Sequence, residues 1–362
     1  MGKQGEWWMT IFGGLSLVMA LPALHSHEPK RLAIYYGYPS VVNGAAGDVR
    51  KAAEAFRSYD VVVFGDGVEF ADQRPDRNPP GVGADENQKA RSIIARLAER
   101  RPAPKVFGYV CLGDSQSLSQ SEIERRVRLW KEMGVSGIFL DEAGYDWKII
   151  DRKRQNAAVA YIHSLGLSAF LNAYYPRDLF SRENLSGKNP DHTAPVVGER
   201  DLFLLESFQV KNGDYEEVAE WKQRVAQAVA ARAQYRSGIF AVTTNQQKLP
   251  FDPQKFTYAW WSAWIYGLDG FGWGEPNFSV PAGILPDRQC TPGEVMPIVS
   301  ENRSSVHTDG VRFWKEIANS FVVIDTSDHS VRRVPSAPSA PAKVAAKQLL
   351  DPNQALACGA IR

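Results

Sequence analysis

From residue 30 onward the chain alternates short apolar segments with longer segments in which apolar residues recur at helical spacing. The apolar segments are rich in Val, Ile, Phe and Tyr and are bounded by glycine, proline or polar residues. Such runs are typical of strands buried on both faces of a parallel sheet. Eight strands are therefore predicted, at residues 31–39, 60–69, 105–113, 136–143, 167–176, 201–210, 238–246 and 270–278.

The segments between these strands carry signals for the start of a helix. Each signal pairs a capping side chain with a later acid or proline: Ser121 with Glu124, Asp214 with Glu217, and Asp252 with Pro253. Strand alternating with helix eight times predicts an α/β fold, a single-domain (β/α)8 TIM barrel at residues 30–325. An open doubly wound sheet is the alternative, but residues 35–39 show no glycine-rich phosphate loop after the first strand.

The two ends of the chain differ in composition from the predicted barrel. Within residues 1–27, the apolar segment 11–24 has a length that suits a signal peptide, which predicts a secreted, periplasmic or cell-envelope protein. Counted back to residue 7, the segment also suits an uncleaved membrane anchor, the one membrane contact that the sequence leaves open. Residues 280–304 predict a long loop, 311–320 a final helix before an apolar run at 321–324, and 331–362 a flexible tail rich in Pro, Ser and Ala.

Composition excludes some classes of function. The formal net charge of +1 gives no reason to expect a nucleic-acid partner. The six histidines show no metal-ligand spacing, so neither a metal nor another cofactor is predicted. Cys111 falls in a predicted core strand, whereas Cys290 and Cys358 could form one disulfide in an oxidising compartment, a pairing that the sequence leaves open.

Carboxylates, amides and aromatic rings stand at the C-terminal ends of the predicted strands, where TIM barrels carry catalytic residues. Asp141 and Glu142 directly follow the apolar run 138–140, and Glu206 interrupts another apolar run. An ionised group costs several kcal/mol to bury without compensation. We therefore expect these acids to serve a function; the alternatives are that one caps the next helix or that Glu206 pairs with a buried cation. Alternation along the strand does not choose between Asp141 and Glu142, because both faces of 138–140 are apolar.

Two opposed carboxylates are the minimal machinery for cleaving a glycosidic bond, and aromatic rings with acids and amides suit a sugar-binding groove. Asp141 and Glu206 are the predicted catalytic pair. The predicted substrate-binding residues are Tyr36, Tyr38, Asp66, Glu69, Tyr109, Glu142, Asn172, Tyr174, Asn245 and Trp273.

Short motifs at these strand ends resemble the spherulin 4-like group of TIM-barrel proteins, classed with glycoside hydrolase family 114. The group includes endo-α-1,4-polygalactosaminidases. The matching residues are the Tyr-rich strand 34–40, 61–64, 107–110, the Gly-Ile-Phe-Leu-Asp-Glu motif at 137–142, 171–172 and 205–207. The resemblance covers residues 31–278 and implies a catalytic Asp at Asp141 and a catalytic Glu at Glu206.

The expectation from the sequence is thus an exported glycoside hydrolase that cleaves internal bonds of a galactosamine-rich polysaccharide. Asp141 is expected to be the nucleophile and Glu206 the general acid/base, although the two roles could be exchanged. Acidic residues around the predicted mouth favour a cationic amino-sugar polymer as the partner. The alternatives are a non-catalytic carbohydrate-binding protein of the spherulin type and a barrel hydrolase of another polysaccharide.

Overall fold

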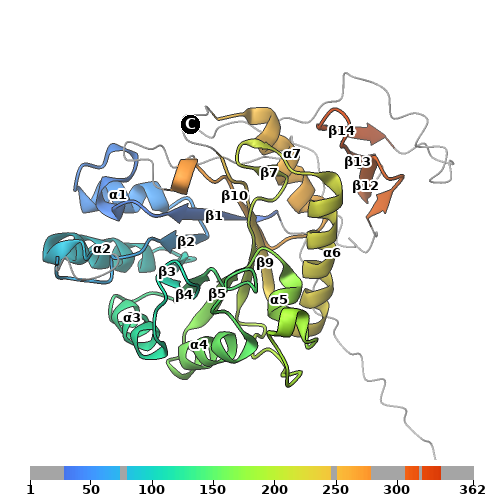
Figure 1. Ribbon diagram of the computed structural model, residues 1–362. Helices are drawn as coiled ribbons and strands as arrows, with labels where there is room; N and C mark the ends of the chain where they lie inside the picture. Colours follow the sequence, from blue (N-terminus) through green and yellow to red (C-terminus); the bar gives the residue numbers. More distant parts are fainter. Residues whose placement is uncertain (1–27, 74–79, 246–250, 279–305, 318–319, 336–362) are drawn as a thin grey trace, which may run out of the picture.

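A computed structural model describes residues 28–73, 80–245, 251–278, 306–317 and 320–335. Eight parallel strands form a closed barrel, which confirms the predicted (β/α)8 class (Figure 1). The barrel strands are β1 (Lys30–Tyr35), β2 (Val61–Phe64), β3 (Lys105–Cys111), β4 (Gly137–Asp141), β5 (Ser168–Asn172), β6 (Leu202–Leu205), β9 (Gly238–Val242) and β10 (Gly270–Gly272). They neighbour one another in the order β1-β10-β9-β6-β5-β4-β3-β2.

Every predicted barrel strand is present, and all eight end earlier in the C-terminal direction than predicted. The strand predicted at residues 60–69, for example, is β2, which spans only Val61–Phe64. The remaining residues of each run leave the sheet and form the mouth of the barrel. Their aromatic and polar side chains therefore belong to loops rather than to strands.

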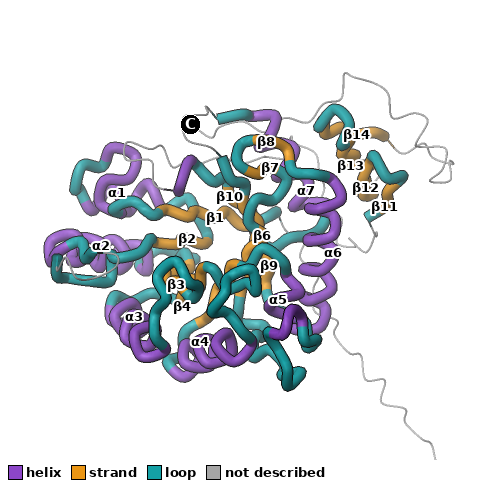
Figure 2. Tube along the Cα trace, in the orientation of Figure 1, coloured by secondary structure: helices purple, strands orange, loops and turns teal. Residues whose placement is uncertain are grey.

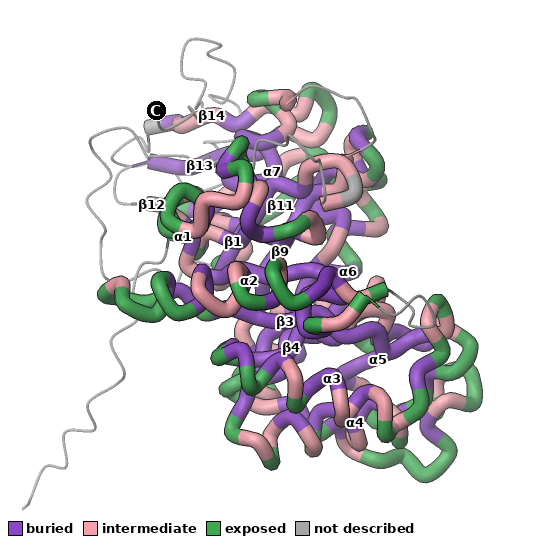
Figure 3. Tube along the Cα trace, turned by 90° about the vertical axis from the view of Figure 1, so that its left-hand side faces the viewer, coloured by how far each residue is buried: buried purple, intermediate pink, exposed green. Residues whose placement is uncertain are grey.

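Helices surround the barrel, with buried residues facing the strands and exposed residues facing outward (Figures 2 and 3). They are α1 (Val49–Phe56), α2 (Gly83–Ala98), α3 (Gln120–Glu132), α4 (Arg152–Ser164), α5 (Pro176–Phe180), α6 (Val218–Tyr235) and α7 (Pro253–Ile265), with short 3-10 turns η1 (Pro39–Gly44), η2 (Leu185–Gly187) and η3 (Pro276–Phe278).

One of the three predicted helix starts is confirmed. Asp252 caps α7 by accepting hydrogen bonds from the backbone N–H groups of Gln254 and Lys255. At α3 the cap is Ser119 rather than Ser121. Asp214 does not cap α6, because it lies in the short strand β8 (Asp214–Tyr215), which pairs with β7 (Val210–Lys211) as a hairpin before the helix.

Aromatic rings fill the inside of the barrel below its mouth. Phe170 packs edge-on against Phe107, Phe139 and Phe240, with ring centroids 5.4, 5.2 and 5.8 Å away. Because these residues come from four different strands, the contacts place their side chains inside the barrel. Side chains two residues further along each strand therefore point towards the C-terminal mouth.

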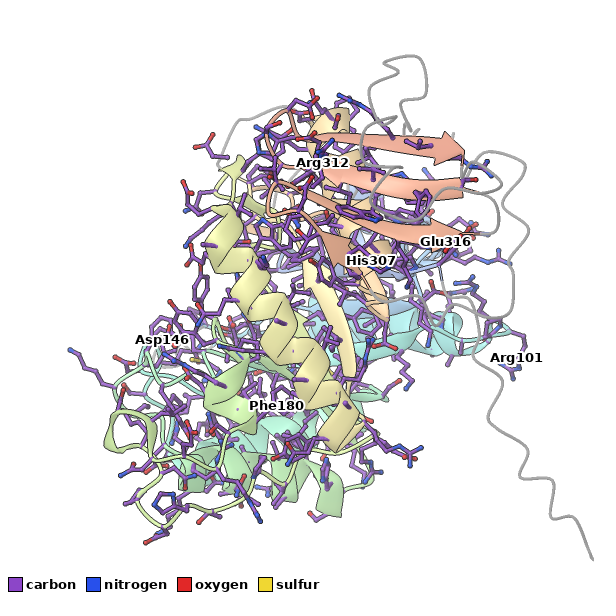
Figure 4. The ribbon with its side chains drawn as sticks, turned by 90° about the vertical axis from the view of Figure 1, so that its right-hand side faces the viewer. Arg101, Asp146, Phe180, His307, Arg312 and Glu316 are labelled. Carbon is purple, nitrogen blue, oxygen red and sulfur yellow. The ribbon has the colours of Figure 1, made fainter. Side chains whose placement is uncertain are left out.

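The predicted final helix at residues 311–320 is wrong, because this segment forms strands. β11 (His307–Thr308), β12 (Arg312–Ile317), β13 (Ser320–Asp325) and β14 (Ser330–Pro335) make an antiparallel sheet beside α6 and α7 (Figure 4). Phe313 anchors this sheet to the barrel, because its ring lies 5.0 Å from that of Trp221 on α6. The first residues of the predicted tail, 331–335, belong to β14 and are therefore ordered strand, which corrects the prediction there.

Several predictions fall on parts of the chain outside the described residues. These parts are the N-terminal segment 1–27, the loop 280–304 with Cys290, and residues 336–362 with Cys358. Within the described ranges, no helix is both long and apolar enough to cross a membrane. Export, signal cleavage and the disulfide stay predictions.

Candidate active site

The centre of the barrel mouth is a carboxyl–amide–carboxyl triad of Asp141, Asn172 and Glu206. Asp141 and Asn172 are the last residues of β4 and β5, and Glu206 follows β6 directly. The Asn172 side-chain amide donates hydrogen bonds of 2.8 Å to Asp141 Oδ1 and of 2.8 Å to Glu206 Oε2. The two carboxyl oxygens are therefore no further apart than the sum of these two bonds.

The pattern of the strands explains why these three side chains meet. Asp141 lies two residues after Phe139, and Asn172 lies two residues after Phe170, whose rings pack inside the barrel. Because side chains alternate along a strand, Asp141 and Asn172 also point inward. Of the two adjacent acids, Asp141 is thus the one whose side chain bonds to Asn172.

Glu142 is turned away from the triad. Its backbone has a left-handed conformation, with φ of 54°, immediately after β4 ends. Its Oε2 accepts a hydrogen bond of 3.1 Å from the backbone N–H of Ser115 and lies 3.4 Å from the Cys111 thiol. Glu142 therefore bonds to the loop after β3, and its predicted role in substrate binding stays a prediction.

The surroundings of the two carboxyls differ in a way that affects their protonation. Burial raises the pKa of Asp141, while hydrogen bonds from Asn172, Tyr109 and the Glu142 backbone N–H oppose this rise. Burial and then the negative charge of Asp141 raise the pKa of Glu206, and Asn172 opposes the rise with one hydrogen bond. More hydrogen-bond donors therefore stabilise the ionised form of Asp141 than that of Glu206.

Two tyrosines form one wall of the mouth. The rings of Tyr36 and Tyr109 meet edge-on, with centroids 5.3 Å apart. Burial and the charge of Asp141 raise the pKa of both phenols, and Glu206 and Asp66 add to this effect at Tyr36. Both hydroxyl groups therefore stay protonated, and the one on Tyr109 can act as a donor to Asp141.

Asp66 and Glu69 form a second acidic group in the loop after β2. Asp66 accepts hydrogen bonds from Gln116 and, at 3.2 Å, from Arg126 Nη1. Burial raises the pKa of Asp66 to about 6, although Arg126 and Gln116 lower it. Because the charge of Asp141 also acts on it, Asp66 belongs to the electrostatic environment of the triad.

Glu69 is buried rather than open at the mouth, and its predicted binding role stays a prediction. Its exposed fraction is 1%, and neither carboxyl oxygen makes a hydrogen bond of good geometry within the described part of the chain. The closest ion pair is with Arg126 Nη1, 3.9 Å from Oε1. Burial and the charge of Asp66 raise the pKa of Glu69 to about 8.

Tyr174 belongs to a separate network beside the triad. Its hydroxyl donates to Glu220 and accepts a hydrogen bond of 2.6 Å from Lys211 Nζ. The Arg224 guanidinium lies 4.0 Å from the centre of its ring. Protein groups thus occupy one face of this ring and also bond to its hydroxyl.

The other predicted binding residues are dispersed. Tyr38 is 51% exposed and precedes η1, so its side chain is open to solvent. The Asn245 side-chain amide donates to the Gly274 carbonyl and so joins two loops. Trp273 is only 7% exposed and packs against Phe251, and its predicted role as a stacking surface stays a prediction.

The sequence interpretation missed two buried arginines near the mouth, Arg126 on α3 and Arg224 on α6. Arg224 Nη2 donates to the backbone carbonyl of Glu206, although no cation stands near Glu206 in the sequence. The available signal was an arginine on the apolar face of a predicted helix, next to Val225 and three residues after Trp221. Within the described residues, no group of three or more His, Cys, Asp or Glu side chains is arranged to hold a metal ion.

Comparison with known proteins gives only distant likenesses. No protein-family model and no curated protein matches the chain. An oxaloacetate acetylhydrolase structure is similar at 16% identity over 68% of this chain and 75% of that chain, with a TM-score of 0.37. A prophage protein of the dihydrodipicolinic acid synthase family from E. coli K12 has 17% identity, coverage of 67% and 69%, and a TM-score of 0.37. The structure of α-galactosidase I from Mortierella vinacea is 12% identical over 84% of this chain and 83% of that chain, with a TM-score of 0.44.

These findings correct the predicted family and function. The predicted membership of the spherulin 4-like and family 114 group is wrong, since no family model matches the chain. The predicted polysaccharide hydrolase and its carbohydrate-binding alternatives are withdrawn with it. The neighbours are enzymes, but at these TM-scores their individual activities say nothing about this chain.

Proposed function

We propose that the protein is an enzyme whose active site is the Asp141–Asn172–Glu206 triad, acting by general acid–base catalysis. The observation that carries the proposal is the single Asn172 amide bonded to both carboxyls at the end of the barrel where catalytic groups are mounted. Two acids held this close do not both ionise readily, so one gives a proton while the other takes one.

The proposed roles follow from the hydrogen bonds. Glu206, with one donor and an apolar setting, carries the proton and acts as the general acid. Asp141, with three donors, stays ionised and acts as the general base or stabilises positive charge on the substrate. Asn172 keeps the two groups oriented, and the Tyr109 hydroxyl holds Asp141 from the other side.

The charges around the triad favour a neutral or cationic substrate that carries hydroxyl or amino groups. Asp66 adds a third carboxyl to the electrostatic field of the mouth. In the part of the chain that the structure describes, three cations near the mouth are paired with acids: Arg126 with Asp66 and Glu122, Arg224 with Glu216, and Lys211 with Glu220. A small anionic acid would be repelled at such a site.

Binding of three small molecules of similar size tests the charge preference. Ethanolamine, ethylene glycol and glycolate carry positive, zero and negative charge, and calorimetry at pH 7 is expected to rank their affinities in that order. Asp141→Asn should reduce the preference for the cation. Tightest binding of glycolate would contradict the proposed substrate class.

Turnover tests the catalytic roles. A panel of small neutral and ammonium-bearing alcohols, amides and esters is incubated in ¹⁸O-labelled or deuterated water, and label incorporation is read by mass spectrometry. Asp141→Asn and Glu206→Gln should each lower incorporation by orders of magnitude, because each keeps its shape and loses its proton chemistry. Glu142→Gln, the adjacent acid that bonds to a loop, is the matched control and should retain activity; equal loss in all three variants would refute the assignment.

A further inference from the structure

Arg224 is buried on the inner face of α6, with an exposed fraction of 1%. A buried guanidinium requires an acid and hydrogen-bond acceptors, because an unpaired charge away from water costs several kcal/mol. Glu216, also buried, supplies the acid through a bond of 2.6 Å from Arg224 Nη1. This pair leaves the other nitrogen atoms of the guanidinium free to bond elsewhere.

Those nitrogen atoms bond to the ends of two neighbouring barrel strands. Nη2 donates to the backbone carbonyl of Glu206, and Nε donates over 2.9 Å to the carbonyl of Tyr174. Tyr174 lies two residues after Asn172, so the guanidinium joins the segments that carry the donor and the acceptor of the Asn172–Glu206 hydrogen bond. A planar guanidinium can bond in these three directions at once, whereas the ammonium group of lysine cannot reproduce this geometry.

The backbone leaves the regular strand directly after Glu206, where the Arg224 guanidinium bonds to it. Ser207, the next residue, has a left-handed conformation with φ of 57°, which turns the chain out of the sheet directly after Glu206. The Ser207 hydroxyl lies 2.8 Å from the Thr244 hydroxyl on the neighbouring loop. Arg224 therefore occupies the carbonyl at the point where the regular strand ends.

We infer that Arg224 is a positioning residue, which fixes the backbone of Glu206 against the end of β5 and so keeps its carboxyl group on Asn172. The inference rests on the proposed function of the triad. A role limited to ion pairing with Glu216 would stabilise the fold but would not require contacts with both strand ends. The contact with the Glu206 carbonyl also brings the positive charge near the general acid, where it opposes the burial and the Asp141 charge that raise the pKa of Glu206.

Carbon-13 NMR of the glutamate carboxyls, with the side-chain amide signals of Asn172, tests this inference without a substrate. In Arg224→Met, the titration midpoint of Glu206 is expected to rise by about one pH unit, because a nearby opposite charge is lost. In Arg224→Lys, the charge stays but the geometry is lost, so the Asn172 amide signals should shift while the midpoint changes less. Glu216→Gln should move the midpoint in the opposite direction, since it removes a negative charge and keeps an acceptor for Arg224.

Arg152→Lys is the matched control. Arg152 is 2% exposed and also bonds to backbone carbonyls, at Leu179, Asp178 and Ser181, but it makes no hydrogen bond to the triad. This variant should lose stability without changing the Glu206 titration. If Arg224→Met does not fold, Arg224→Lys and Glu216→Gln carry the test.

The outcomes separate this inference from the proposed function. A wild-type Glu206 that titrates as an ordinary acid, with free Asn172 amide signals, would refute the proposed function itself. The wild type could instead show a coupled pair. If the Glu206 midpoint and the Asn172 amide signals are then unchanged in Arg224→Lys and Glu216→Gln, or change equally in Arg152→Lys, only the role of Arg224 is refuted.

Discussion

Replacing Glu69 by glutamine should make the protein more stable than the wild type at alkaline pH and equally stable at acid pH. Glu69 is buried, and Arg126 Nη1 lies 3.9 Å from its Oε1. Burial and the charge of Asp66 raise the pKa of Glu69 from about 4.5 to about 8. Glutamine has nearly the shape of the protonated acid and never ionises.

The sign of the effect follows from proton binding. Between the unfolded and folded pKa values, the folded protein holds a proton on Glu69 that the unfolded chain has released. The stability from this group is therefore fully present below the unfolded pKa and is lost as the pH rises through about 8. One pKa unit corresponds to about 1.4 kcal/mol, so the loss is at most roughly 5 kcal/mol and, after relaxation and water entry, on the order of 2–3 kcal/mol.

Urea unfolding at pH 5, 7 and 9 measures this difference. The free energy of unfolding of Glu69→Gln should match that of the wild type at pH 5 and exceed it by about 2 kcal/mol or more at pH 9. Glu54→Gln, at a side chain that is 69% exposed, controls for the change in net charge. Parallel stability curves for the wild type and Glu69→Gln would show that Glu69 ionises normally and would refute the reasoning.

Three further predictions follow from other parts of the structure. Asn172→Leu removes the donor shared by both carboxyls, so NMR titration should show the pKa of Asp141 and of Glu206 raised by about one unit; unchanged midpoints would show that the bridge is absent. Phe313→Ala should lower the free energy of unfolding by about 3–5 kcal/mol in urea denaturation, because a buried ring that packs on the barrel is lost, and a loss below about 1 kcal/mol would contradict this packing. Cys111 should resist alkylation at pH 8 until the protein unfolds, as mapped by peptide mass spectrometry, because burial raises its pKa to about 12; rapid labelling of the folded protein would contradict its burial.

The barrel could be predicted from the sequence because strands of a parallel barrel are buried on both faces. The segments containing Val61–Phe64 and Gly137–Asp141 accordingly appear as continuous apolar runs between polar residues. The C-terminal ends of the strands were predicted less well. Residues beyond them remain partly apolar at the mouth, so composition does not mark where hydrogen bonding between strands stops.

The C-terminal sheet was missed because one polar residue hides the strand pattern. On β12, Phe313 and Lys315 are both buried, and Lys315 Nζ donates over 3.3 Å to the carbonyl of Ile265 at the end of α7. A lysine at a buried position breaks the apparent alternation of apolar and polar residues. The spacing of Phe313, Trp314 and Ile317 also fits a helix, so the sequence alone favoured the wrong element.

The triad was accessible to sequence reasoning, but the groups that support it were not. Asp141, Asn172 and Glu206 each follow a strongly apolar strand, and the closure of the barrel brings these strand ends together. The left-handed turn at Glu142 and the contact of Arg224 with Glu206 depend on tertiary structure. The family resemblance failed because it rested on short strand-end motifs that other barrels can share.

Titration of Glu206 in the wild type and in Asp141→Asn tests the central claim most directly. The claim is that the two carboxyls are coupled through Asn172 and hold one proton between them. Carbon-13 NMR should place the wild-type Glu206 midpoint above the ordinary range of glutamate, with Asp141 ionising first, and Asp141→Asn should lower that midpoint because the neighbouring charge is gone. A Glu206 midpoint near the ordinary value in the wild type, unchanged by Asp141→Asn, would contradict the account.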